Sequence, residues 1–168
     1  MNQLDLYREL ENQVKADILK NNFIQEDRHL DRQVWSLPGH FIVLKDLELI
    51  NYLSSQVPLT KYDNDLARME KSLEDAINLA KKDKDSRQLM VFNDSDYNII
   101  HQCFTHFQFV MTARDEFDLY VYQRSADVSK LKDDLTFFAN LASMFGDRVG
   151  INVTKIVVVY GSIHFTKE

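Results

Sequence analysis

The chain has 168 residues, of which 45% are hydrophobic and 11% aromatic, and a formal net charge of −6. This composition predicts one compact domain, residues 1–168, with a substantial core. The negative charge argues against a protein that binds duplex nucleic acid through its overall field. A single cysteine excludes an intrachain disulfide and a cysteine-cluster zinc site, and favours a reducing, cytoplasmic setting.

No stretch of the sequence has the apolar length of a membrane span. The first residues, Met1 to Asp5, lack the basic segment that precedes an apolar one in a secretion signal. We therefore expect no membrane contact and no targeting segment.

The first half of the chain predicts mainly helices. Apolar residues three and four positions apart predict an amphipathic helix over residues 4–21, another helix begins within 47–53, and a third covers 64–84. Residues 33–44 predict extended chain, interrupted by a turn or bulge at Pro38-Gly39.

The second half predicts most of a sheet. Aromatic and β-branched residues indicate strands over 89–92, 103–112 and 117–123, the last two joined as a hairpin. Residues 133–145 predict a helix closed by Gly146. The nearly continuous apolar run 151–160 predicts a strand buried on both faces. The expected fold class is therefore α+β: an aromatic-rich sheet with helices packed on it.

The residues most informative about function are Cys103 and the run Gln123-Arg124-Ser125. A cysteine can serve as a nucleophile when a nearby cation lowers the pKa of its thiol. Each feature alone has an ordinary structural explanation, because a lone cysteine is often a buried hydrophobe and such a polar run often ends a strand. Together they favour a nucleophile beside an anion-binding strand.

These segments resemble thymidylate synthase and its relatives, the deoxycytidylate hydroxymethylases. In that family a nucleophilic Cys precedes Phe-Gln-Phe, and a hairpin then leads to Tyr-Gln-Arg-Ser-x-Asp-Val. The chain supplies Cys103, residues 107–109 and residues 122–128 in that order. Weaker matches are Asp27-Arg28, the helix segment Glu48-Leu49-Ile50-Asn51-Tyr52-Leu53, Asp85-Ser86-Arg87 and Gly161-Ser162-Ile163-His164. The resemblance implies a thymidylate synthase-like mixed sheet in a single domain.

For the phosphate of a pyrimidine nucleotide, the resemblance implies binding by Arg28, Arg87 and Arg124 with the hydroxyl of Ser125, beside Gln123 of the same motif. Guanidinium groups suit this role because they donate several hydrogen bonds in a fixed geometry. Surface ion pairs are the alternative for each arginine. In the family, the arginine matched by Arg87 reaches into the partner's site, which implies a homodimer.

For the chemistry, the resemblance implies that Cys103 attacks carbon 6 of the pyrimidine and makes carbon 5 nucleophilic towards a one-carbon unit. Glu48 would be the carboxylate that handles protons, the alternative being a solvated helix residue. Asp127 resembles the aspartate that contacts nucleotide and folate. His164 resembles the histidine that binds the sugar hydroxyl, although a structural role is the alternative.

Asp134 bears on the choice of base. With a one-residue deletion, it aligns with the Asn that recognises uracil in the synthases, where hydroxymethylases acting on dCMP carry Asp. A carboxylate accepts from the exocyclic amine of cytosine, so that Asp134 favours dCMP over dUMP. The alternative is that Asp133 or Asp134 caps the following helix.

Two classes of function follow from the resemblance. The first is a transferase that methylates or hydroxymethylates dCMP or dUMP at carbon 5 with 5,10-methylenetetrahydrofolate; retention of Cys103 and Glu48 favours it. The second is a non-catalytic nucleotide-binding or regulatory protein. It is favoured by the shortened folate segment, since Trp35 is the only tryptophan and lies outside that segment. We prefer the transferase.

Overall fold

The computed structural model describes residues 2–27, 31–58, 61, 63–92 and 104–166. Cys103 and Arg28 lie outside the described residues.

A six-stranded mixed sheet in the order β1-β2-β6-β5-β4-β3 organises the fold. Neighbouring strands are antiparallel, except for the parallel pair of β5 and β6. The strands are β1 (Phe23–Asp27), β2 (Arg32–Leu44), β3 (Met90–Phe92), β4 (Phe104–Ala113), β5 (Glu116–Asp127) and β6 (Asn152–Thr166).

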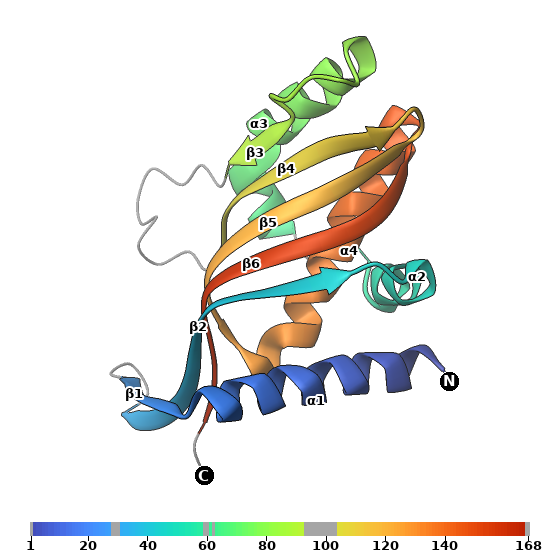
Figure 1. Ribbon diagram of the computed structural model, residues 1–168. Coiled ribbons are helices and arrows are strands. Elements are labelled where there is room, and N and C mark those ends of the chain that lie inside the picture. Colours follow the sequence, from blue (N-terminus) through green and yellow to red (C-terminus); the bar gives the residue numbers. More distant parts are fainter. Residues whose placement is uncertain (1, 28–30, 59–60, 62, 93–103, 167–168) are drawn as a thin grey trace.

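The four α-helices of the described residues are α1 (Gln3–Asn21), α2 (Leu47–Gln56), α3 (Asp63–Lys82) and α4 (Leu131–Val149). Figure 1 shows α2, α3 and α4 behind the sheet, and α1 across the base of the view beside the lower end of β2. A short 3-10 turn, η3 (Val128–Lys130), links β5 to α4. The expected mixed α+β fold is thus confirmed.

Aromatic packing between the sheet and α4 forms the centre of the core. The rings of Phe109 and Phe145 stack with centroids 3.7 Å apart, and Phe117 meets Phe145 edge-on at 5.3 Å. All three side chains are fully buried. Because burial of large aromatic surface is strongly favourable, this contact holds α4, and with it the start of that helix, against β4 and β5.

Two predictions about this region are wrong in detail. Gly146 does not close the helix: α4 continues to Val149, and Gly150 in the left-handed conformation (φ 80°) follows it. Gly146 is instead a point of close approach, since a Cβ there would lie 2.6 Å from the carbonyl oxygen of Ile151. The strand expected at 151–160 is buried on one face only: Ile156, Val158 and Tyr160 are buried, and the residues between them are half-buried.

The interruption expected at Pro38-Gly39 is not found, because β2 runs unbroken from Arg32 to Leu44 and keeps the same register with β6 on both sides of Gly39. Gly39 has a φ of 65°, and the regular pairing of β2 with β6 skips it, passing from Pro38 to His40. Gly39 is thus a local irregularity within one continuous strand.

One face of the sheet carries no helix of the described residues, and we call it the open face. Side chains alternate between the two faces of a strand, so that Tyr122 points away from the buried Val121 and Gln123. The open face has a broad apolar character, with the exposed side chains of Phe41, Val43, Phe92 and Tyr122 among its members.

Candidate functional site

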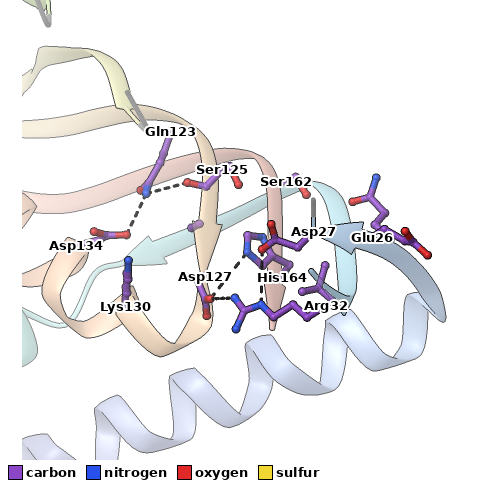
Figure 2. A pocket seen from close by; sticks show the side chains of 13 residues that line it. Glu26, Asp27, Arg32, Gln123, Ser125, Asp127, Lys130, Asp134, Ser162 and His164 are labelled. Atoms are coloured by element: carbon purple, nitrogen blue, oxygen red, sulfur yellow. Dashed lines mark hydrogen bonds and ion pairs between the residues drawn. The ribbon is translucent and has the colours of Figure 1, made fainter. Parts of the chain in front are cut away.

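A pocket of about 580 Å³ lies where β5 and β6 end beside the β1–β2 hairpin and the start of α4. Figure 2 shows side chains from all of these elements turned towards it. The lining residues are Gln25, Glu26, Asp27, Arg32, Val34, Gln123, Ser125, Ala126, Asp127, Lys130, Asp134, Ser162 and His164. Five residues proposed from sequence thus meet here: Gln123, Ser125, Asp127, Asp134 and His164.

Gln123 and Asp134 form the inner end of the site. The Gln123 amide nitrogen donates to Asp134 Oδ2 at 3.0 Å and to the carbonyl oxygen of Ser125 at 3.2 Å. Gln123 is only 2% exposed, whereas Asp134 is half-buried at the pocket wall. The Asp134 carboxylate is held in place by this hydrogen bond, and its oxygens can still accept hydrogen bonds from a ligand.

The alternative explanation of Asp134 as a helix cap does not apply. The residue at the N-cap of α4 is Lys130, and both Asp133 and Asp134 lie inside the first turn. Acidic residues there interact favourably with the helix dipole, which accounts for the pair in general terms. It does not account for the hydrogen bond that Asp134 receives from another element.

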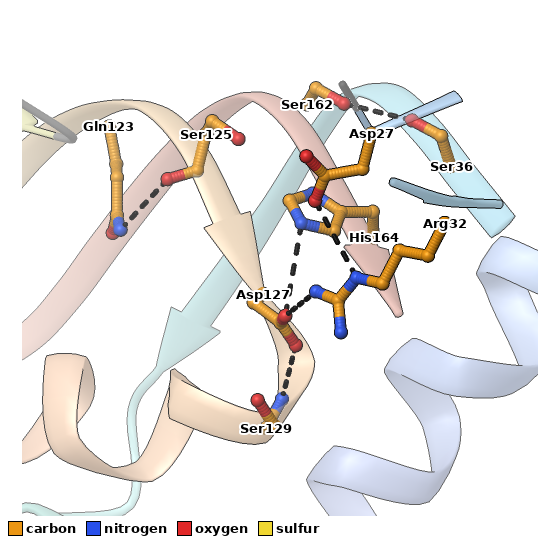
Figure 3. A network of polar contacts seen from close by, with 9 residues as sticks. All are labelled: Asp27, Arg32, Ser36, Gln123, Ser125, Asp127, Ser129, Ser162 and His164. Atoms are coloured by element: carbon orange, nitrogen blue, oxygen red, sulfur yellow. Dashed lines mark hydrogen bonds and ion pairs between the residues drawn. The ribbon is translucent and has the colours of Figure 1, made fainter. Parts of the chain in front are cut away.

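Arg32 links the outer strands of the site. Its Nη2 lies 2.9 Å from Asp127 Oδ2, and its Nε lies 3.6 Å from Asp27 Oδ2. Figure 3 shows the guanidinium between the two carboxylates, with His164 beside them. Arg32 therefore joins β1 and β2 to the end of β5 across β6, and closes one side of the pocket.

The ionisation of Asp127 and His164 follows from these contacts. Burial alone would raise the pKa of Asp127, but hydrogen bonds from Ser129 and Arg32 outweigh it and lower that pKa. Burial lowers the pKa of His164, against the opposing charges of Asp127 and Asp27. At neutral pH the site thus holds an ionised Asp127 and a neutral His164, whose Nε2 lies 3.9 Å from Asp127 Oδ2.

This arrangement predicts loss of stability in mild acid. A lowered histidine pKa in the folded state means that the unfolded chain binds more protons than the folded chain below about pH 6.5. The contribution of His164 to the free energy of unfolding is therefore fully present above that pH and is lost as the pH drops towards the folded pKa. His164→Gln should therefore flatten the fall in unfolding free energy between pH 7 and 5, measured by urea titration. Burial also lowers the pKa of His40, so His40→Gln should remove a separate part of the slope. Equal slopes for parent and His164→Gln would contradict the assignment.

The described lining does not fit a folate. Binding a flat pterin ring calls for an apolar or aromatic stacking surface. Among the lining residues only His164 carries a ring, and Glu26, Asp27, Asp127 and Asp134 are carboxylates. The described lining of this pocket therefore holds no stacking surface suited to 5,10-methylenetetrahydrofolate.

Three other residues proposed from sequence do not line the pocket. Glu48 is exposed at the start of α2, where its side chain accepts from Gln3 at 3.4 Å. Arg124 is exposed and, by strand alternation, projects to the open face, opposite Gln123. Arg87 is exposed, and its carbonyl oxygen accepts from Gln108 of β4.

Sequence reasoning missed several residues of the site. Arg32 and Lys130 supply its two cationic side chains, and Ser162 donates to or accepts from Ser36 at 2.9 Å. A second Asp-Arg pair at 31–32, four residues after the first at 27–28, was a usable signal for Arg32. No local pattern marks Lys130 or Ser162, because contacts between distant strands place them.

Comparison with known protein families finds one match. The model of the thymidylate synthase family matches residues 56–168, which is more than half of the chain and includes β5, α4 and β6. The chain therefore belongs to the thymidylate synthase family. The matched range does not include Glu48, Arg28 or Arg32. A search of curated proteins returned no match.

The helices of the described residues include none with the length and apolarity needed to cross a membrane. The same residues include no cluster of three or more His, Cys, Asp or Glu side chains arranged to hold a metal ion.

Proposed function

We propose that this chain binds a pyrimidine deoxynucleotide, dCMP or dUMP, and acts as a carbon-5 transferase through a covalent adduct with Cys103. The observation that carries the proposal is the Gln123–Asp134 hydrogen bond, which fixes a carboxylate at the inner end of a pocket shared with Ser125, Asp127 and His164. A base at Asp134 would place its sugar towards His164 and Asp127.

Cys103 is proposed as the nucleophile from the resemblance to the family. It lies outside the described residues, and it is followed in the chain by Phe104, the first residue of β4, which pairs with Gln123. Attack of the thiolate on carbon 6 forms an S–C bond, and the electron pair of the 5,6 double bond moves to carbon 5 and the carbon 4 substituent.

For the base, we propose that Asp134 selects cytosine. The carboxylate accepts from the exocyclic amine, whereas the carbon 4 oxygen of uracil would face another acceptor. Glu48 as the proton-handling carboxylate stays part of the proposal from the resemblance alone, since its exposed position at α2 adds no support.

For the phosphate, we propose Ser125 of the pocket together with Arg28 of the same chain. Arg124 stays part of the proposal from the resemblance alone, since its side chain projects to the open face. Lys130 is a further candidate, because it lines the pocket and has no ion pair within the described part of the chain, whereas Arg32 is paired with two carboxylates. Arg87 is proposed to act in the partner's site.

The open face supports a homodimer. Phe41 is 62% exposed, Phe92 52% and Val43 46%, a set of large apolar side chains on one sheet face. Contiguous apolar surface of this kind usually marks an interface. Arg87 lies near this face, since its carbonyl oxygen bonds to the Gln108 side chain there. A cytoplasmic location is proposed from the family and the single cysteine.

A binding protein without catalysis is the second candidate. The described lining offers no stacking surface for a folate, and Glu48 does not line the pocket. The family typically uses methylenetetrahydrofolate as donor, and the mechanism proposed here ends at the activated carbon 5.

The test is exchange of the carbon 5 hydrogen for deuterium in D₂O, without folate. If Cys103 adds to carbon 6, carbon 5 takes up a deuteron, then loses the original proton as the S–C bond breaks and the nucleotide is restored. We expect dCMP to gain one deuterium by mass spectrometry with the parent chain, and none with Cys103→Ser.

The control is binding of dCMP by Cys103→Ser, measured by calorimetry. Binding without exchange in the parent chain would favour the second candidate over the transferase. No binding of either nucleotide by the parent would contradict both.

A further inference from the structure

Two residues that face each other across β5 and β6 each bury a polar atom without a hydrogen-bond partner. Gln123 and Tyr160 are directly paired in the strand register. Within the described part of the chain, neither Gln123 Oε1 nor the Tyr160 hydroxyl has a partner, and both atoms are buried. Leaving such groups unpaired is costly, so each orphaned atom calls for an explanation.

The two orphaned atoms are chemically complementary. Gln123 Oε1 can only accept, and the amide nitrogen of the same side chain already donates to Asp134 and to the Ser125 carbonyl. The Tyr160 hydroxyl can donate, and burial, with a contribution from the charge of Asp134, raises the pKa of Tyr160 far above its ordinary value. Tyr160 therefore keeps its proton and remains a donor.

We propose that Tyr160 is a positioning residue of the base-binding site: its hydroxyl donates to Gln123 Oε1, and this bond fixes the Gln123 amide that holds Asp134. The inference rests on the proposed function, because the base that Asp134 would read belongs to that proposal. The two residues sit opposite each other on neighbouring strands, which lie about 4.8 Å apart. A change of side-chain rotamer or one intervening water would join the two atoms.

The orientation of the amide matters for recognition. With nitrogen towards Asp134, the amide supports a carboxylate that accepts hydrogen bonds, as a cytosine amine requires. With the amide turned over, Oε1 would face the carboxylate, and two acceptors would repel each other. Tyr160 therefore favours the orientation of the Gln123 amide in which Asp134 accepts a hydrogen bond from the exocyclic amine of cytosine.

The test compares Tyr160→Phe with the parent in two measurements. We expect the melting temperature to fall by about 2–4 °C, the effect of losing one hydrogen bond in a domain of this size. We also expect the preference for dCMP over dUMP, the ratio of their dissociation constants, to fall by about fivefold or more. Tyr120→Phe is the matched control, because its hydroxyl contacts Asp118 and is remote from the pocket; it should leave the preference unchanged.

The opposite results are equally defined. If the Tyr160 hydroxyl truly has no partner, Tyr160→Phe removes a buried unsatisfied group and the melting temperature should stay level or rise, which would overturn the inference. A lower melting temperature with an unchanged base preference would also overturn it, since Tyr160 would then be only structural.

Failure of the proposed function is recognised separately. If the parent chain binds neither nucleotide, that proposal falls, and the hydrogen bond is judged by the melting temperatures of Tyr160→Phe, Gln123→Met and the double variant. If the double variant loses less melting temperature than the sum of the two single variants, the hydrogen bond between the two side chains is supported. If the losses are additive, the bond is overturned.

Discussion

Asp134→Asn should move the base preference from dCMP towards dUMP. An amide in this place can donate to the carbon 4 oxygen of uracil and accept from its nitrogen 3 proton, whereas the carboxylate accepts from the amine of cytosine. Because a buried polar mismatch is relieved for one base and created for the other, the shift should amount to about 1–3 kcal/mol, or roughly 5- to 150-fold. Calorimetric titration with each nucleotide measures it.

The matched control for this experiment is Asp133→Asn. Asp133 is exposed in the same first turn of α4, so that its replacement changes the charge and the helix dipole interaction equally without touching the pocket. Base preference should be unaltered by it. Equal binding of both nucleotides by the parent and by Asp134→Asn would show that Asp134 does not read the base.

Phe41→Glu should convert a dimer into monomers. Phe41 is the most exposed large apolar side chain of the open face, and aromatic residues at the centre of an interface often contribute 2 kcal/mol or more to binding. Burial of a charge in its place adds a desolvation cost. We expect the dimer dissociation constant to rise by at least about 30-fold, as measured by sedimentation equilibrium.

Leu19→Glu provides the comparison for this variant. Leu19 is similarly apolar and 48% exposed, but it lies on α1, away from the open face. It should leave the association unchanged. A parent chain that sediments as a monomer at micromolar concentration would contradict the homodimer and the role of Arg87 in a partner's site.

Periodicity predicted the elements that have one clear apolar face. The helix over 4–21 was predictable because Tyr7, Val14 and Ile18 fall on one side and pack into the core. The end of α4 was not predictable. Gly146 is required there because the carbonyl oxygen of Ile151 lies too close for a side chain, and no local sequence pattern indicates that contact. β6 was predicted as doubly buried because Val157 and Val159 are apolar, yet they lie on the open face.

The site was predictable where one motif carries several of its residues. Gln123, Ser125 and Asp127 occur within five positions of one strand, and strand alternation explains why Arg124 between them leaves the pocket. Arg32 begins β2, which is separated from β5 in the sheet by β6, and only the pairing of these distant strands brings it to Asp127. Tyr160 was hidden in an apolar run, where nothing distinguishes it from a core residue.

We expect the pocket between β1, β5, β6 and α4 to hold a pyrimidine deoxynucleotide with its base at Asp134. A crystal structure with dCMP bound tests it most directly. We expect the exocyclic amine within hydrogen-bond distance of Asp134, the sugar beside His164, and carbon 6 facing Cys103. A nucleotide bound elsewhere, or bound with its phosphate rather than its base at Asp134, would show that this pocket does not read the base.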